Sequence, residues 1–227
     1  MDRTLFAWDM NGTLETGSER ADAEALNIFF SEMGIARRVT DEEMRLAPLA
    51  WTDRINMFAS DVDVTNARID RVVRLREELS VGYAKAFPGA VEALKEVKRR
   101  GDDNIVVSLI GKEIIERTIG KIGIKEYVDA AYSARDEFFA MGDNKGNYID
   151  LLKRLAANKA RLVERHAQGR SYRRKIVIGD QPEDIASGQL CRAVTFFIGK
   201  GKADYSVKGP LDVVGIAYAD AADLKKH

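Results

Sequence analysis

The sequence predicts an α/β fold, with a doubly wound, Rossmann-like parallel sheet core and an inserted all-helical cap domain. Three observations lead to this prediction. A short apolar strand begins the chain, a helical block follows it, and helices and strands alternate after residue 85. Alternation of this kind favours a parallel sheet covered by helices on both faces. The 227 residues suit a core with a smaller inserted domain.

The first part of the chain contains one strand and then only helical patterns. The strand is expected at Thr4–Trp8, where an apolar run is stopped by Asp9-Met10-Asn11-Gly12. Thr40 and Glu43 have the spacing of a capping box, which marks a helix start. Helical patterns cover residues 18–33, 53–60 and 65–84.

The motif Phe87-Pro88-Gly89 ends this block, and alternating elements follow it. We expect helices at 90–100, 114–122 and 148–167, and strands at 105–107, 128–132, 175–178 and 193–198. The helical block therefore interrupts the core. We expect the core to comprise residues 1–16 and 86–227, and the helical cap domain residues 17–85.

Composition excludes several classes of protein. Lys+Arg and Asp+Glu balance at 36 each, so we expect no general affinity for nucleic acid or for an anionic membrane. The single cysteine, Cys191, can form neither an intrachain disulfide nor a Cys-rich zinc site. No signal peptide and no apolar span of about 20 residues is found, so a cytoplasmic location is expected. Nothing in the sequence specifies an oligomeric state.

Polar side chains are expected where the core strands end. Asp9 follows the first strand, Ser108 the second, and Asp180 the fourth, with Asp184 one helical turn further on. Ligands of doubly wound sheets bind outside the carboxyl ends of the strands. Converging carboxylates repel each other unless a cation lies among them. Because oxygen ligands in small number suit Mg²⁺, the pattern predicts a magnesium site.

These motifs, in this order, resemble those of the haloacid dehalogenase-like hydrolase superfamily. The resemblance spans essentially the whole chain. It is carried by Leu5-Phe6-Ala7-Trp8-Asp9-Met10-Asn11-Gly12-Thr13-Leu14, by Ile105-Val106-Val107-Ser108, by Ile176-Val177-Ile178-Gly179-Asp180-Gln181-Pro182-Glu183-Asp184, and by the hinge Phe87-Pro88-Gly89-Ala90.

The resemblance implies a role for each matching position. Asp9 would attack phosphorus and form an aspartyl-phosphate. Asp9, the backbone carbonyl of Asn11 and Asp180 would hold Mg²⁺, with Asp184 in support. Ser108 would bind a phosphoryl oxygen.

The family also requires a lysine. We choose Lys145, in Gly142-Asp143-Asn144-Lys145-Gly146 just before the long helix, over Lys112, Lys121 and Lys125.

Asn11 departs from the family pattern. Phosphatases of the family usually carry an aspartate here, which protonates the leaving group and then activates water. An amide cannot shuttle a proton, although its backbone carbonyl can still bind the metal. Three explanations stay open: a slow phosphatase or one whose leaving group needs little protonation, a protein that binds phosphate compounds without turnover, and an engineered change that traps a ligand.

The expected cap loop, residues 46–54, offers substrate contacts. Trp51 could stack on a substrate, and Arg54 or Arg45 could clamp an anion. The alternative is that Trp51 belongs to the core of the cap and that Arg54 is a surface charge. Residues 15–84 contain no lysine, which argues against the Schiff-base chemistry of phosphonate hydrolysis.

The sequence thus predicts a magnesium-dependent phosphatase of small phosphomonoesters, with a small phosphorylated metabolite as its partner. The alternative is a catalytically impaired or non-catalytic protein that binds phosphate ligands on the same fold.

Overall fold

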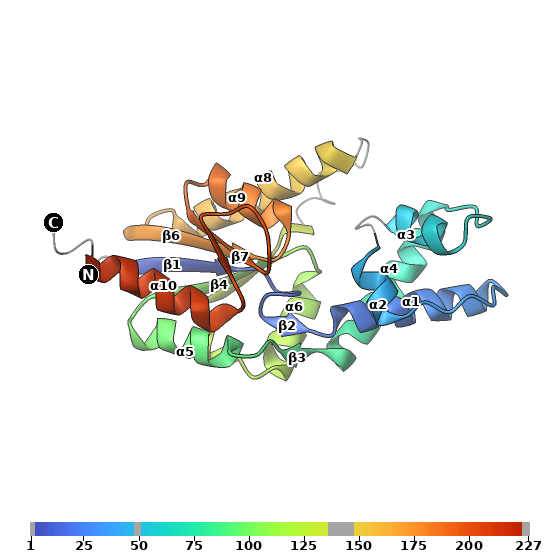
Figure 1. Cartoon of the computed structure of the whole chain (residues 1–227), viewed down its shortest axis with the longest axis horizontal. Helices are drawn as coiled ribbons and strands as arrows, with labels where there is room; N and C mark the ends of the chain where they lie inside the picture. Colours follow the sequence, from blue (N-terminus) through green and yellow to red (C-terminus); the bar gives the residue numbers. More distant parts are fainter. Residues whose placement is uncertain (1–2, 48–50, 136–147, 224–227) are drawn as a thin grey trace. The chain divides into compact units, whose positions relative to one another are not determined.

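The computed structural model describes residues 3–47, 51–135 and 148–223 (Figure 1). The chain divides into two compact units. The first contains residues 1–15 and 86–227, and the second contains residues 16–85. Thr16, which the sequence analysis placed in the core, belongs to the second unit. No helix in the described ranges is long and apolar enough to cross a membrane.

The first unit is an α/β core. Its strands are β1 (Arg3–Trp8), β4 (Asp103–Ser108), β5 (Ala130–Ser133), β6 (Tyr172–Gly179), β7 (Val194–Ile198) and β8 (Tyr205–Val207). Its helices are α5 (Ala90–Arg99), α6 (Lys112–Lys121), α8 (Tyr148–Ala167), α9 (Pro182–Leu190) and α10 (Pro210–Asp223), with a 3₁₀ turn at Lys125–Tyr127.

The six strands form one parallel sheet in the order β5-β4-β1-β6-β7-β8. The strand that begins the chain therefore lies at the centre, between β4 and β6. This arrangement confirms the predicted doubly wound fold. Strand β8 and helix α10 were not predicted from the sequence, because residues 205–207 are few and α10 is rich in small residues that give no clear apolar stripe.

Helices cover both faces of the sheet (Figure 1). On the α8 and α9 face, alternate residues of the central strands pack with Leu162, Val163 and Cys191; these strand residues are Leu5, Ala7, Ile105, Val107 and Val177. On the α5 and α10 face, the ring of Phe6 contacts those of Trp8 and Tyr218. This period-two alternation gives each face of the sheet its own apolar layer.

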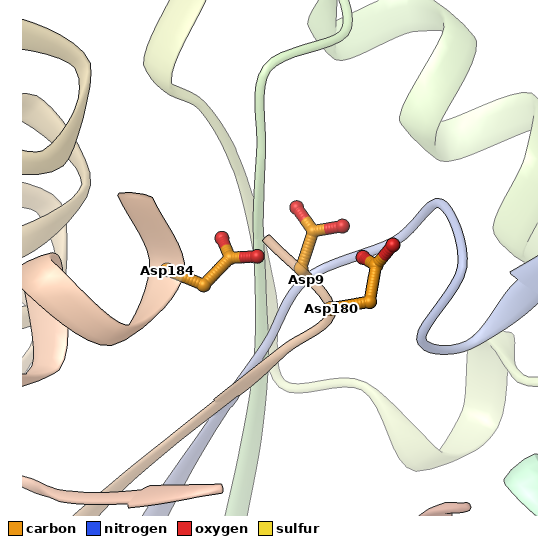
Figure 2. A group of neighbouring side chains, drawn as sticks. All are labelled: Asp9, Asp180 and Asp184. Carbon is orange, nitrogen blue, oxygen red and sulfur yellow. The ribbon is translucent and has the colours of Figure 1, made fainter. Parts of the chain in front are cut away.

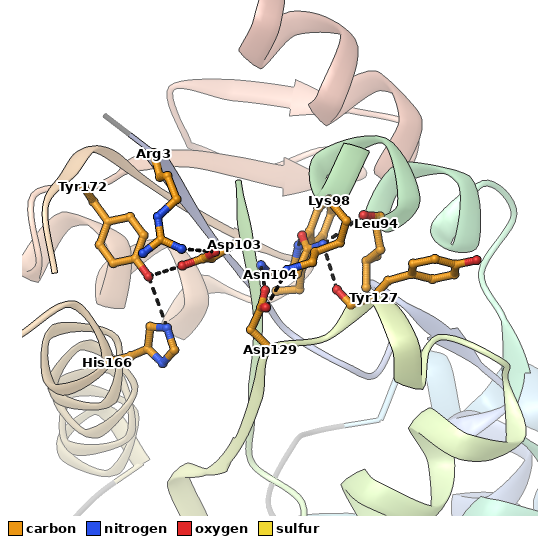
Figure 3. A network of polar contacts seen from close by, with 10 residues as sticks. Arg3, Leu94, Lys98, Asp103, Asn104, Tyr127, Asp129, His166 and Tyr172 are labelled. Atoms are coloured by element: carbon orange, nitrogen blue, oxygen red, sulfur yellow. Dashed lines mark hydrogen bonds and ion pairs between the residues drawn. The ribbon is translucent and has the colours of Figure 1, made fainter. Parts of the chain in front are cut away.

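Hydrogen bonds between polar side chains link the strands near the amino-terminal edge of the sheet (Figure 3). Asn104 is fully buried, accepts a hydrogen bond from Trp8 Nε1 at 2.9 Å, and donates to the carbonyls of Leu94 and Tyr127, both at 3.0 Å. Its neighbour Asp103 accepts from Arg3 at 2.8 Å. Buried polar groups are tolerated when they are hydrogen-bonded in this way, and here they join β1 to β4.

The second unit contains the helices α1 (Ser18–Glu32), α2 (Asp41–Arg45), α3 (Trp51–Phe58) and α4 (Asn66–Tyr83). Their shared core includes Leu26, Phe30, Ile55 and Val72. Thr40 and Glu43 form the predicted capping box at the start of α2. Where the chain passes between the units, β2 (Glu15–Thr16) pairs with β3 (Lys85–Ala86).

Candidate active site

Asp9 follows the central strand β1. Its backbone N–H donates to the carbonyl of Ile178 at 2.8 Å, so the β1–β6 ladder continues up to this residue. The side chain is buried, with only 8% of the residue exposed. Strand pairing on both sides of β1 therefore holds the Asp9 carboxylate at the carboxyl edge of the sheet, where ligands of such folds bind.

Two further carboxylates come from β6 and the helix after it. Asp180 follows β6 directly and accepts a hydrogen bond from the Gln181 side chain at 2.9 Å. Asp184 lies in the first turn of α9, where its Oδ2 accepts from the backbone N–H of Gln181 at 3.1 Å. That capping contact fixes the direction of the Asp184 side chain.

The three carboxylates meet at one point (Figure 2). One oxygen of each of Asp9, Asp180 and Asp184 lies within 4.8 Å of the others, so the group could hold a metal ion. The sequence predicted this convergence from strand ends alone. It arises because β1 and β6 are neighbours that run in the same direction.

Two glycines make this close approach feasible. A Cβ atom at Gly12, which has a φ of +73°, would lie 2.4 Å from Asp180 Oδ2. A Cβ atom at Gly179 would lie 2.1 Å from Asp184 Oδ2. Any larger residue at either position would displace a carboxylate of the group.

Lys159 completes the cluster, and the sequence analysis did not select it. It lies on α8, is 97% buried, and its ammonium is 2.7 Å from Asp9 Oδ1 and 2.5 Å from Asp184 Oδ1. Burial acts to lower the pKa of Lys159, but Asp184 and Asp9 outweigh it, and the net pKa is raised. Lys145, the predicted lysine, lies outside the described residues.

A sequence signal for Lys159 exists. Lys159 follows Leu155 by four residues and precedes Leu162 and Val163 by three and four, so it lies on the apolar stripe of α8. A lysine at the centre of such a stripe must be buried, and a buried lysine requires an acidic partner.

Negative charge exceeds positive charge in this cluster. Three carboxylates converge beside one ammonium, which contacts two of them, Asp9 and Asp184. Burial, followed by the nearby charge of Asp9, raises the pKa of Asp180 to about 7. Glu183 adds a fourth carboxyl group, which is 96% buried and has an oxygen with no hydrogen-bond partner among the described residues. Burial raises the pKa of Glu183 as well. This surplus of buried oxygen ligands fits a divalent cation.

Comparison with known proteins decides the family. The profile described as haloacid dehalogenase-like hydrolase matches residues 1–189. The chain belongs to the haloacid dehalogenase-like hydrolase family. The resemblance carried by the sequence motifs, including a helical insert after the first strand, is thereby confirmed.

Solved structures of this family share the fold. A haloacid dehalogenase-like family hydrolase from Streptococcus pneumoniae is 16% identical, with a TM-score of 0.66, over 94% of this chain and 98% of that one. A subfamily IA hydrolase from Geobacter sulfurreducens is 16% identical, with a TM-score of 0.66, over 94% and 96%. CbbY from Rhodobacter sphaeroides in complex with phosphate is 18% identical, with a TM-score of 0.62, over 94% and 96%. No curated protein matches the chain.

Two other residues of the family motifs lie at the same edge of the sheet. Ser108 is buried at the end of β4, the strand beside β1. Asn11 is half-buried in the turn after β1, where it forms an isolated bridge with Glu15. In the same turn, Thr13 Oγ1 is 3.4 Å from Asp180 Oδ1. Ser108 thus ends the strand beside β1, and Asn11 lies in the same turn as Thr13.

The helical unit engages Arg54 and Trp51 in its own structure. Arg54 is 92% buried and donates to Asp22 Oδ2 at 2.7 Å, while Arg76 donates to Asp22 Oδ1 at 2.9 Å. The Arg54 guanidinium lies 4.7 Å from the centre of the Trp51 ring. Trp51 packs against the apolar core of the unit. These contacts favour a structural role for both residues, in which Arg54 is a buried ion-pair partner rather than a surface charge.

Proposed function

We propose that the chain is a magnesium-dependent phosphatase of small phosphomonoesters that works through an aspartyl-phosphate on Asp9. The observation that carries this proposal is the cluster of Asp9, Asp180 and Asp184, in which the ammonium of Lys159 contacts Asp9 and Asp184. A nucleophilic carboxylate needs neighbouring positive charge before it can approach a phosphoryl group, and this cluster combines one fixed cation with ligands for another.

Mg²⁺ would be held by Asp9, Asp180 and the backbone carbonyl of Asn11, with Asp184 in support. The all-oxygen donor set and its surplus of buried negative charge suit this ion. When bound, Mg²⁺ would supply positive charge to the phosphoryl oxygens and to the nucleophile.

In the first step, an oxygen of Asp9 attacks phosphorus. The new Oδ–P bond forms as the bond from phosphorus to the ester oxygen breaks, and the ester oxygen leaves with the bonding electron pair. Lys159 holds the Asp9 carboxylate through its 2.7 Å contact, so we assign to Lys159 the role first given to Lys145. Ser108 would donate its hydroxyl hydrogen to a phosphoryl oxygen.

In the second step, water attacks phosphorus and releases inorganic phosphate and the Asp9 carboxylate. This step requires a group that accepts a proton from the water. Asn11 occupies the position where the family's phosphatases usually carry an aspartate, and an amide does not accept that proton. Hydrolysis of the aspartyl-phosphate is therefore the step that we expect to limit turnover of activated esters. With alkyl phosphates we expect the first step to be slow as well, because Asn11 cannot protonate the departing alcohol.

The helical unit, residues 16–85, would act as the cap that selects the substrate. The similarity to CbbY, whose structure contains phosphate, supports a phosphorylated ligand. Small phosphorylated metabolites are the substrate class that we propose.

A screen of phosphomonoesters with Mg²⁺ tests the function. Asp9→Asn should abolish release of phosphate, and a chelator should do so reversibly. Glu113→Gln, which changes a largely exposed carboxyl group on α6, is the matched control and should retain activity. Full activity of Asp9→Asn would exclude Asp9 as the nucleophile.

Asn11 also favours a second function, a protein that binds phosphate ligands without turning them over. Binding and hydrolysis separate the two. Magnesium-dependent binding of a phosphate analogue, with no hydrolysis by the natural chain, would establish the second function.

A further inference from the structure

Helix α8 carries Lys159. Hydrogen bonds on either side of Lys159 join α8 to strand β5 and to the residue just beyond the end of β5. Asn158, the residue before Lys159, donates its side-chain N–H to the carbonyl of Ala134 at 2.9 Å, just beyond the end of β5. His166, in the last turn of α8, contacts the hydroxyl of Tyr132 in β5 through Nδ1 at 2.9 Å. Asn158 and His166 are each 95% buried.

His166 also joins α8 to the central strands. Its Nε2 lies 3.4 Å from the hydroxyl of Tyr172, the first residue of β6 (Figure 3). The Tyr172 hydroxyl donates to Asp103 at the start of β4, and Asp103 accepts from Arg3 of β1. One imidazole ring therefore connects the end of α8 to β5 through Tyr132. Through Tyr172 and Asp103, the same ring connects α8 to β6, β4 and β1.

The neutral form of His166 suits these contacts. Burial lowers the pKa of His166. A neutral imidazole offers one donor and one acceptor, and a tyrosine hydroxyl can act as either. The ring can therefore hydrogen-bond to the hydroxyls of both Tyr132 and Tyr172 without adding a buried positive charge between α8 and the sheet.

Because the contacts of Asn158 and His166 hold α8 in place on the sheet, they also determine the position of the Lys159 side chain. His166 follows Lys159 by seven residues, two helical turns, so both side chains point toward the sheet from one face of α8. A slide of α8 along its axis would move the ammonium away from Asp9 and Asp184, to which it lies 2.7 and 2.5 Å. Contacts of this length are lost after a shift of about 1 Å.

We propose that Asn158 and His166 are positioning residues, which set the register of α8 on the sheet and so hold the Lys159 ammonium between Asp9 and Asp184. The kinetic consequence rests on the proposed phosphatase function, whereas the structural consequence does not. Neither residue needs to touch the substrate.

The structural consequence is tested by NMR of the ammonium of Lys159 in protein labelled with ¹⁵N-lysine. A buried, ion-paired ammonium exchanges its protons slowly, and Lys159→Met identifies its signal by removing it. Asn158→Ala and His166→Leu should weaken or shift this signal, and His166→Gln, which keeps a hydrogen-bonding group, should restore part of it. Tyr218→Phe is the control, because it removes a 2.7 Å hydrogen bond to Asp102 that does not involve α8.

The kinetic consequence is tested on the same variants. Asn158→Ala and His166→Leu should lower kcat by about 10- to 100-fold, because small misplacements of a catalytic group have effects of this size, while KM changes less than about twofold. In a Lys159→Met background, either change should lower kcat by no more than about twofold further. Tyr218→Phe should leave kcat unchanged.

These measurements separate the possible failures. If Asn158→Ala and His166→Leu lower thermal stability but leave the Lys159 signal and kcat as in the natural chain, the two residues are only structural and the proposal is overturned. Effects on kcat that are fully additive with Lys159→Met would overturn it as well. If the natural chain hydrolyses no phosphomonoester, the proposed function fails, and the NMR signal still decides the positioning role. If His166→Leu does not fold, Asn158→Ala and His166→Gln decide it.

Discussion

The ammonium of Lys159 lies 2.7 Å from a carboxylate oxygen of Asp9, although 150 residues separate them in the sequence. This contact joins α8 to the end of the central strand. It places the cationic charge of the cluster on a helix rather than on a loop.

Replacement of Lys159 should therefore affect catalysis strongly. We expect Lys159→Met to lower kcat by about 100- to 1,000-fold, the usual effect of removing one group that stabilises developing charge. Lys153→Met, an exposed lysine on the same helix, should have no effect, and Lys145→Met should have little. Steady-state assays of the three variants check this. Loss of activity in Lys145→Met with normal activity in Lys159→Met would reverse the assignment.

Asn11→Asp should restore a proton carrier. General acid–base help is worth about 100- to 10,000-fold, so turnover of alkyl phosphates should rise by at least about tenfold, and turnover of activated aryl or acyl phosphates should rise less. Asn11→Ser, which supplies no carboxylate, should give no increase. The natural chain should accumulate phosphorylated Asp9 when given an activated donor, and mass spectrometry after an acid quench would detect it. Unchanged turnover in Asn11→Asp would show that another group carries the proton.

Asp180 should make the stability of the metal-free protein depend on pH. Its pKa is raised from 3.8 to about 7, so the folded state binds this proton more tightly than the unfolded state. The contribution of Asp180 to the free energy of unfolding is then greatest below about pH 4 and is lost as the pH rises to about 7. Thermal unfolding in chelator should show this decline, and Asp180→Asn should reduce it. Added Mg²⁺ should stabilise the natural chain more at pH 8 than at pH 5.5, because the metal binds the ionised form.

Gly12 and Gly34 form a matched pair for testing the metal site. Both have a left-handed backbone, with φ of +73° and +72°, so alanine at either costs about 1 kcal/mol of stability. Only at Gly12 would the new Cβ collide with Asp180, since no atom lies within 4 Å of the Cβ position at Gly34. Gly12→Ala should therefore lose Mg²⁺ binding, measured by calorimetry, and Gly34→Ala should retain it. Equal affinity in the two variants would place the metal away from Asp180.

Arg54 should contribute to the stability of the helical unit more than to substrate binding. Arg54→Ala leaves the buried Asp22 with one partner instead of two, and we expect a loss of about 1–3 kcal/mol in unfolding free energy. Arg71→Ala, which breaks an exposed ion pair with Glu32, should change stability much less, because solvent screens this pair. Denaturant unfolding and KM should be measured on both variants. A large rise in KM for Arg54→Ala with unchanged stability would favour the anion clamp instead.

The sequence predicted the parts of the site that depend on local pattern and strand direction. An apolar strand followed by Asp9, and another followed by Gly179-Asp180, must bring both carboxylates to one edge once the strands are parallel neighbours. Lys159 escaped prediction because its spacing on an amphipathic helix shows only that it is buried. Which carboxylates it reaches depends on how α8 lies on the sheet.

The role of Arg54 was also hidden in the sequence. Its burial depends on Asp22 of α1 and Arg76 of α4, so three separate helices must pack before the ion pair exists. Nothing in the local pattern around residues 51–54 distinguishes a guanidinium that points to a ligand from one that pairs inside the unit.

The central position of β1 has a consequence for the order of folding. Although β1 begins the chain, one of its two neighbours is β6, and Arg3 pairs with Tyr172. The backbone of β1 therefore remains half unpaired until three-quarters of the chain has left the ribosome. The contacts within residues 16–85 are much more local, and local contacts form sooner because less loop entropy is lost. During synthesis, the helical unit can thus acquire its structure while the apolar segment Leu5-Phe6-Ala7-Trp8 still lacks one of its neighbouring strands. Until β6 is synthesised and pairs with it, this segment can aggregate.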